Sequence, residues 1–162
     1  MKRMTAKTIM AVAAAILLFT GCAAKDDVKL ARQVVTQLVQ GRYSVRKLID
    51  WENLKAMEYS VGAEYKALAN DKERESYQKS FIDGFKRGFV DQGAKLRTFY
   101  NWRFLAKVDP TLNIVAANVH DDKFLLLVAV KHAGRTRKVV ELKIIKILDP
   151  QKFREMEQGF VK

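Results

Sequence analysis

Residues 124–130 read Phe-Leu-Leu-Leu-Val-Ala-Val, an unbroken run of seven apolar side chains. Successive side chains of a β-strand point to opposite faces of its sheet, so such a run suits a strand that is covered on both faces. Ala133-Gly134 then turns the chain. The run therefore predicts a strand near the middle of a sheet, and the rest of the fold is expected to form around it.

A longer strand with one apolar face is predicted before this run. From Leu96 the hydrophobic period changes from about 3.6 to 2, and Asp109-Pro110 ends the pattern. One face would carry Leu96, Thr98, Tyr100, Trp102, Phe104, Ala106 and Val108, and the other would carry Arg97, Phe99, Asn101, Arg103, Leu105 and Lys107.

Two further strands complete a predicted antiparallel sheet of four. Residues 112–119 form the second strand, before a turn at His120-Asp121-Asp122. Residues 138–148 form the last strand, which ends at Asp149-Pro150. Its alternation slips by one position at Ile144 and Ile145, which predicts a β-bulge there. Residues 151–159 would add a short terminal helix or a frayed tail.

Three helices are predicted before the sheet. Residues 27–40 place apolar side chains at helical spacing, and Gly41 ends the pattern. Asp50 is a plausible N-cap for a second helix that reaches residue 68, although Gly62 interrupts it. Asn70 and Glu73 have the spacing of a capping box and would open a third helix over residues 71–92.

The third helix carries four aromatic side chains one turn apart, at Tyr77, Phe81, Phe85 and Phe89. Such a ridge is most often core packing, and the alternative is one wall of a ligand site. Gly84 and Gly88 leave room for another backbone or a ligand, at a cost of about 1 kcal/mol each. Together the elements predict a single α+β domain over residues 27–162, with three N-terminal helices packed on a curved four-stranded antiparallel sheet.

The first 21 residues have the pattern of an export signal. Lys2, Arg3 and Lys7 precede eleven apolar residues at 9–19. At about 1.5 Å per residue that run spans about 16 Å, roughly half of a bilayer's hydrocarbon core. A cleaved signal peptide over residues 1–21 is therefore favoured over a permanent transmembrane helix.

Phe19-Thr20-Gly21-Cys22 resembles the bacterial lipobox, although Phe19 stands where Leu, Val or Ala is usual. The resemblance implies that Cys22 becomes the first mature residue and carries acyl chains such as palmitate, with residues 22–26 as a lipidated start and short tether. The alternative is a small buried thiol. Ala23 and Ala24 follow Cys22, and neither is the aspartate that would resemble an inner-membrane retention signal. In a cell with two membranes, we therefore expect an outer-membrane lipoprotein that faces the periplasm.

The charge of the chain favours anionic contacts. Loss of the signal peptide removes three of the thirty basic residues and none of the eighteen acidic ones, so the net charge falls from +12 to +9. Export excludes nucleic acid as a partner, and it leaves anionic envelope components, lipid or an envelope protein. His132 and its basic neighbours form a hairpin tip, and we expect this tip to be solvated. The candidate contacts for an anion are the basic residues of the tip, Lys131, Arg135, Arg137 and Lys138.

No catalytic or metal-binding pattern stands out. His120-Asp121-Asp122 reads as an ordinary turn, because adjacent residues in a tight turn rarely converge on one point. The single cysteine excludes a disulfide within the chain and a zinc site built on several thiolates. We therefore expect no enzyme activity, no cofactor and no metal.

The order of elements resembles the nuclear-transport-factor-2-like superfamily, in which helices lie in the concave face of a bent sheet. A narrower similarity, carried by Leu48 to Trp51, by residues 68–75 and by residues 77–89, is to periplasmic phospholipid-binding auxiliary proteins of ABC-type lipid transport. Some enzymes of the superfamily use an Asp and a Tyr, here Asp50 and Tyr100. Either resemblance implies a cavity between helix and sheet, lined by Trp51, Tyr77, Phe81, Phe85, Tyr100, Trp102 and Phe104.

The leading hypothesis is thus a non-enzymatic lipoprotein of the cell envelope that binds an apolar or lipidic ligand, or a partner segment, in this cavity. One alternative is a structural or assembly module whose aromatic side chains only fill the core. A small enzyme working within the cone is the third.

Overall fold

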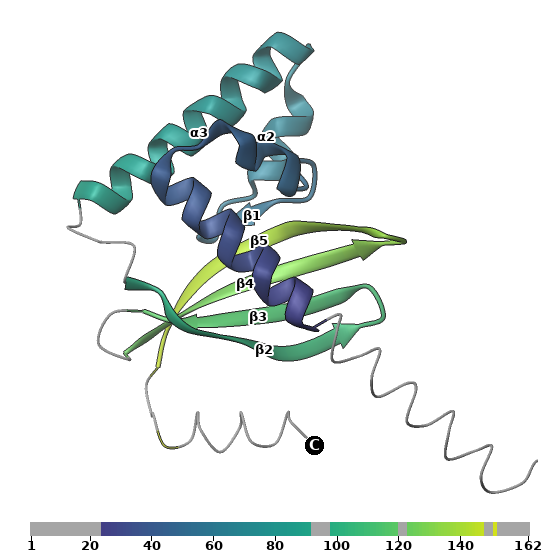
Figure 1. Cartoon of the computed structure of the whole chain (residues 1–162). Helices are drawn as coiled ribbons and strands as arrows, with labels where there is room; N and C mark the ends of the chain where they lie inside the picture. Colours follow the sequence, from purple (N-terminus) through teal and green to yellow (C-terminus); the bar gives the residue numbers. More distant parts are fainter. Residues whose placement is uncertain (1–23, 92–97, 120–122, 148–150, 152–162) are drawn as a thin grey trace, which may run out of the picture.

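The computed structural model describes residues 24–91, 98–119, 123–147 and 151. The predicted signal peptide, Cys22, the turn at residues 120–122 and, apart from Gln151, the expected terminal helix lie outside the described residues. The described chain is an α+β fold in which helices pack on a five-stranded sheet (Figure 1). A first helix over residues 24–40 is followed by η1 Tyr43–Leu48, β1 Lys55–Ala56, α2 Val61–Ala67, α3 Asp71–Asp91, β2 Tyr100–Asp109, β3 Leu112–Asn118, β4 Phe124–Ala133 and β5 Thr136–Lys146.

The strand order is β1-β5-β4-β3-β2, so β4 is the central strand of the five. This confirms the prediction made from residues 124–130. Leu125 and Leu126 point to opposite faces, and both are fully buried. The meander from β2 to β5 is antiparallel, as predicted. The expected total of four strands is wrong, because β1 adds a fifth that runs parallel to β5.

The prediction of one helix from Asp50 to residue 68 is wrong. The segment instead runs along β5, where the Asp50 N–H donates to Val139 and the Met57 N–H donates to Leu142. Met57 and Glu58 have φ values of 48° and 76°, which no right-handed helix contains. Pairing with β5 outweighs the helical spacing of the apolar residues, and only the last part, α2, is helical.

The start of α3 agrees with the predicted capping box. The Glu73 N–H donates to Oδ1 of Asn70 over 2.9 Å, and the Asn70 side-chain amide donates to Oε1 of Glu73 over 2.9 Å. Oε2 of Glu73 also accepts from the Ala69 N–H over 3.0 Å. The helix extends to Asp91, close to the predicted end. The first helix ends at Gly41, whose φ of 67° a residue with a side chain rarely adopts.

The alternation predicted for β2 is interrupted in the structure. Asn101 has a φ of 51°, and the pairing with β3 shifts between Tyr100 and Arg103 and again between Phe104 and Ala106. Two residues assigned to the apolar face, Tyr100 and Val108, are 39% and 60% exposed. Irregularities of this kind are common in edge strands, and β2 is one edge of this sheet.

The bulge in β5 lies earlier than predicted. Ala129 pairs with Glu141 and Val130 pairs with Val139, so Val140 is the extra residue. Ile144 and Ile145 are in regular register with Leu126 and Leu125, which makes the predicted position wrong. The two isoleucines therefore point to opposite faces of the sheet, and Ile144 remains 40% exposed.

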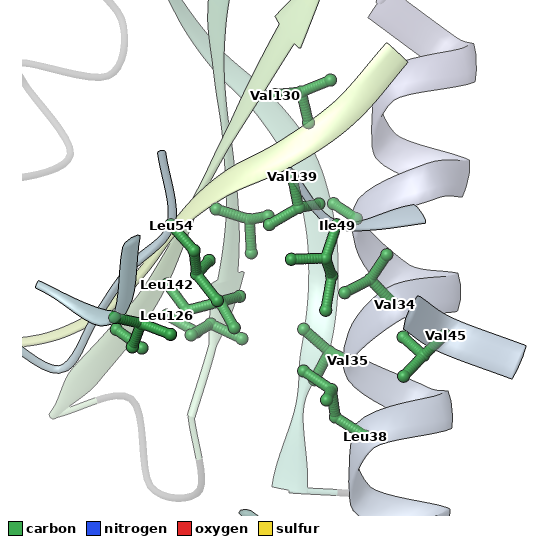
Figure 2. Close-up of a cluster of buried hydrophobic side chains, with 14 of the residues drawn as sticks. Val34, Val35, Leu38, Val45, Ile49, Leu54, Leu126, Val130, Val139 and Leu142 are labelled. Atoms are coloured by element: carbon green, nitrogen blue, oxygen red, sulfur yellow. The ribbon is translucent and has the colours of Figure 1, made fainter. Parts of the chain in front are cut away.

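The core lies between the first helix, the η1 to β1 segment and the sheet (Figure 2). Val34, Val35 and Leu38 enter from the first helix, as their spacing predicts. They meet Val45, Ile49 and Leu54 from the irregular segment and Leu126, Val130, Val139 and Leu142 from the sheet, all of them 1% exposed or less. The first helix is thereby fixed across the sheet, and its remaining surface forms one side of the candidate site.

Candidate ligand-binding groove

A groove of about 1080 Å³ runs between the first helix and the beginning of β2. One wall comes from helix residues spaced three and four apart over four turns, together with Arg42 just beyond the helix. The other wall is the four-residue stretch 99–102. The lining residues are Lys25, Val28, Lys29, Arg32, Gln33, Thr36, Gln37, Gln40, Arg42, Phe99, Tyr100, Asn101 and Trp102.

The irregular start of β2 shapes the second wall. In a regular strand neighbouring side chains alternate between faces, so only every second residue would reach the same groove. The positive φ of Asn101 and the register shift beside it break this alternation. As a result, Phe99, Tyr100 and Trp102 all line the groove.

A narrower slot of about 210 Å³ adjoins the groove. Val35 and Val39 of the first helix and the rings of Phe99 and Trp102 form its apolar walls, while Arg32 and Thr36 line both the slot and the groove. The ring centroids of Phe99 and Trp102 are 6.3 Å apart, and that of Phe99 lies 5.2 Å from that of Phe89 on α3. The site thus combines an open groove, lined mainly by polar and basic residues, with a narrower slot in which four of the six lining residues are apolar.

The groove is positively charged. Lys25, Lys29, Arg32 and Arg42 line it, and none of the described residues that line it is acidic. Among the described residues, no carboxylate forms an ion pair with any of these four side chains. The nearest acidic residues in sequence, Asp26 and Asp27, have other cationic partners. A negatively charged ligand group would therefore meet several cations that have no carboxylate partner among the described residues.

Only two of the seven side chains that were expected to line one cavity lie in the groove. Tyr100 and Trp102 line the groove. Trp51 is 6% exposed, and its Nε1 donates to the carbonyl of Arg46 over 2.9 Å, so it is part of the core. Phe81 meets Trp51 edge-to-face at 5.5 Å. Phe104 is half-buried and is paired with Val115 of β3.

Tyr77 also lies away from the groove, beside α2. Its hydroxyl donates to Oε2 of Glu64 over 2.6 Å. Burial and this hydrogen bond to a carboxylate raise the pKa of Tyr77 to about 12. The ring neighbours Tyr65, whose ring in turn lies 6.1 Å from Trp51.

The predicted rings nevertheless belong to one connected row. Phe85 links Phe81 to Phe89, with centroid separations of 6.4 Å on each side. Phe89 then contacts Phe99, which contacts Trp102. The helix rings and the strand rings therefore meet, through Phe89 and Phe99, two residues that were not expected to line the cavity.

The cations of the groove were not identified from the sequence. Lys25, Lys29 and Arg32 stand at positions i, i+4 and i+7 of the first helix, a spacing that places three positive charges on one face. This pattern was available before the structure was known. The sequence did not predict that Phe99 faces these cations, because Phe99 was assigned to the opposite face of its strand from Tyr100 and Trp102.

The hairpin tip is only partly as expected. Lys131, Arg135 and Lys138 are exposed, so they stay candidates for contact with anions. Arg137 is already engaged, since one terminal nitrogen lies 2.7 Å from Oδ2 of Asp26 and its Nε lies 3.5 Å from Oδ1 of Asp27.

The expectation that His132 is solvated is wrong. Its side chain is 20% exposed, and Nε2 lies 2.9 Å from Oδ2 of Asp27, which is fully buried. The side-chain amide of Asn113 donates to the same oxygen over 2.7 Å. This cluster fixes the start of the first helix, and with it the end of the groove that carries Lys25, Val28 and Lys29.

An active site built on Asp50 and Tyr100 is not formed. The Asp50 N–H is bonded to β5, whereas Tyr100 begins β2, and β4 and β3 lie between these two strands. Asp50 lies beyond β5, so four strand spacings of about 4.8 Å, or about 19 Å, separate its segment from β2.

Comparison of the chain with models of protein families, with curated proteins and with solved structures finds no match. Among the described residues, no helix has both the length and the apolar character that are needed to cross a bilayer. The fold and the groove therefore supply the argument for function.

Proposed function

We propose that this chain is a non-enzymatic lipoprotein of the cell envelope, anchored through Cys22, and that it binds an amphiphilic, lipid-like ligand between the first helix and β2. The observation that carries the proposal is the slot between the apolar side chains of Val35, Val39, Phe99 and Trp102, which adjoins a groove that is lined by cations and neutral polar side chains. A ligand with an alkyl segment and a polar head matches these two environments.

The dimensions of the site support a ligand of this kind. Pockets for small molecules usually have volumes of about 300–1,000 Å³, and the groove, at about 1080 Å³, lies just above that range. The slot adds about 210 Å³ of space beside the groove. Apolar walls hold water poorly, so an alkyl segment that enters the slot gains the free energy of leaving water.

The position of the site relative to the expected anchor also supports the proposal. Three Cα–Cα steps of about 3.8 Å separate Cys22 from Lys25, so the two residues are at most about 11 Å apart. With acyl chains on Cys22, the end of the groove at Lys25 would lie beside the bilayer surface. A lipid could then reach the groove without crossing a long aqueous distance.

We also propose that the fold is related to the nuclear-transport-factor-2-like superfamily. The order of helices followed by a meander supports this, as does the position of the first helix across one face of the sheet (Figure 1). The short parallel strand β1 and the bulge at Val140 of β5 were not part of the layout on which this resemblance was based.

Native mass spectrometry of the full-length protein, extracted from its own membrane in a mild detergent, tests ligand binding. We expect a co-purifying lipid or other amphiphile that is lost from the Trp102→Ala variant. Tyr59→Ala is the matched control, because Tyr59 is 75% exposed and lies outside the groove. An empty wild-type protein, or a ligand retained equally by both variants, would contradict the proposed site.

A separate experiment tests the predicted lipid anchor at Cys22. Cys22→Ser should release the protein from the membrane fraction or leave its signal peptide uncleaved. Membrane attachment with normal cleavage in this variant would contradict lipidation at Cys22, and the groove proposal would then lose its argument from proximity to the bilayer.

A further inference from the structure

We infer that the groove selects an anionic phospholipid, whose phosphate is held by Lys25, Lys29 and Arg32 at the end of the groove that lies nearest the expected anchor. This inference rests on the proposed function, since it assigns the head group of the ligand whose alkyl segment fills the slot.

The three cations form one face of the first helix. Their spacing spans seven residues, or about 10 Å along the helix axis. Like charges four residues apart on a helix repel each other, so Lys25 and Lys29 destabilise the helix in the absence of a counter-ion. Among the described residues, no carboxylate forms an ion pair with any of the three. Binding of an external anion would relieve this repulsion.

The neighbouring carboxylates cannot easily take that role. Asp27 is fully buried against His132 and Asn113, on the side of the helix that faces the sheet. Asp26 is held at 2.7 Å by Arg137 of β5. Both acidic residues of the first helix are thus turned toward the hairpin, so every charged residue on the groove face of this helix is a cation.

Arg32 connects the charged region to the apolar one, because it lines both the groove and the slot. A guanidinium can donate two parallel hydrogen bonds to a phosphate. A phosphodiester with an acyl chain beside it would therefore place its phosphate at Arg32 and its chain between Val39 and Trp102. The remainder of the groove is lined mainly by neutral polar side chains, among them Gln33, Gln37 and Gln40.

The uneven distribution of the cations along the groove supports a membrane lipid as the source of the phosphate. Three of the four groove cations lie in the half of the helix next to the expected anchor, and only Arg42 lies at the far end. Basic residues near a bilayer attract anionic lipids within about one Debye length, roughly 8 Å at physiological ionic strength. This arrangement would keep the head group at the membrane surface.

The test uses full-length protein that has been purified in neutral detergent and freed of lipid. Native mass spectrometry then measures binding of phosphatidylglycerol and of phosphatidylcholine with the same acyl chains. Phosphatidylcholine carries the same phosphate but adds a trimethylammonium cation, which would lie beside three basic side chains and be repelled by them, so we expect phosphatidylglycerol to bind at least about ten-fold more tightly. A variant with Lys25→Gln, Lys29→Gln and Arg32→Gln should bind the two lipids equally.

The matched control carries Lys66→Gln, Lys72→Gln and Lys79→Gln. It loses the same charge from exposed positions on α2 and α3 that lie outside the groove. Glutamine is a good helix former, so the unfolding temperatures of both triple variants should lie within a few degrees of that of the wild type. The control should keep its preference for phosphatidylglycerol.

Each other outcome is decisive. Equal binding of the two lipids by the wild type overturns the anionic head group and leaves the proposed function standing. Binding of neither lipid overturns both. An equal loss of preference in the control variant shows that net charge alone is responsible and overturns the site. Free glycerol phosphate that competes as strongly as the whole lipid overturns the assignment to a membrane lipid.

Discussion

Nε2 of His132 lies 2.9 Å from Oδ2 of Asp27, although 105 positions separate the two residues in the chain. A carboxylate oxygen accepts hydrogen bonds, so Nε2 is the ring nitrogen that carries the proton in this contact. The carboxylate of Asp27 is fully buried and also accepts from Asn113 of β3. The start of the first helix is thereby attached to two strands of the sheet, and the groove depends on that attachment.

Replacing Asp27 with Ala should lower the free energy of unfolding by about 3 kcal/mol, because it leaves the partners of a buried charge without an acceptor. Urea unfolding measures the change. Asp26→Ala is the control and should cost less than about 1 kcal/mol, since its ion pair with Arg137 is exposed. Additive effects of Asp27→Ala and His132→Ala in the double variant would show that the two side chains are not coupled.

Two glycines should respond in opposite directions to substitution by Ala. A Cβ atom on Gly62 would lie 2.3 Å from the backbone oxygen of Glu52, so Gly62→Ala forces the backbone to move and should destabilise the protein by about 1–3 kcal/mol. A Cβ atom on Gly84 would have nothing from another part of the described chain within 4 Å. Gly84→Ala should therefore stabilise α3 by up to about 1 kcal/mol.

Thermal unfolding of both glycine variants gives the comparison. A loss of stability in Gly84→Ala equal to that in Gly62→Ala would mean that the exposed face of α3 is covered in the folded protein. That result would point to a partner on this face, and it would contradict the open space found beside Gly84.

The stability of the protein should fall as the pH rises from 10 to 12, in part because of Tyr77. Its pKa is raised from 10.0 to about 12 in the folded protein by burial and by the hydrogen bond to Glu64. Between these values the folded state holds a proton that the unfolded state has lost, so each increase in pH favours unfolding. Tyr77→Phe should reduce this dependence.

Ultraviolet absorbance of the phenolate form measures the titration directly, as the difference between wild type and Tyr77→Phe. Glu64→Gln removes the negative charge that the phenolate would meet, so it should lower the pKa of Tyr77. An unchanged titration in Glu64→Gln would assign the shift to burial alone.

Trp51 and Trp102 should separate stability from binding. Trp51→Ala removes a core ring together with its hydrogen bond to Arg46 and should cost about 3–5 kcal/mol. Trp102→Ala should cost less, because its ring is only half-buried, yet it removes one wall of the slot. Urea unfolding and lipid retention are measured on the same two variants. Equal costs of unfolding, with lipid retained in both variants, would favour the alternative in which the aromatic side chains serve only packing.

Several parts of this fold were predictable because they depend on neighbours in sequence. The apolar run at residues 124–130 predicts a strand with two covered faces, and it is the central strand. Asn70 and Glu73 predict a helix start because a capping box needs only residues three apart. Gly134 has the positive φ that its predicted turn requires. The α+β class follows from these local signals together.

The sequence alone also determined the positive charge of the chain and the expectation of a lipid anchor at Cys22, an expectation that stays a prediction. Tertiary structure decided the rest. Residues 50–60 have helical spacing but pair with β5, because hydrogen bonds to a strand more than 80 positions away outweigh local propensity. The backbone of Asn101 brings Phe99 and Trp102 to the same groove, and the partner of His132 is found only when the first helix crosses the sheet. Contacts between distant segments form through packing, and no local pattern encodes them.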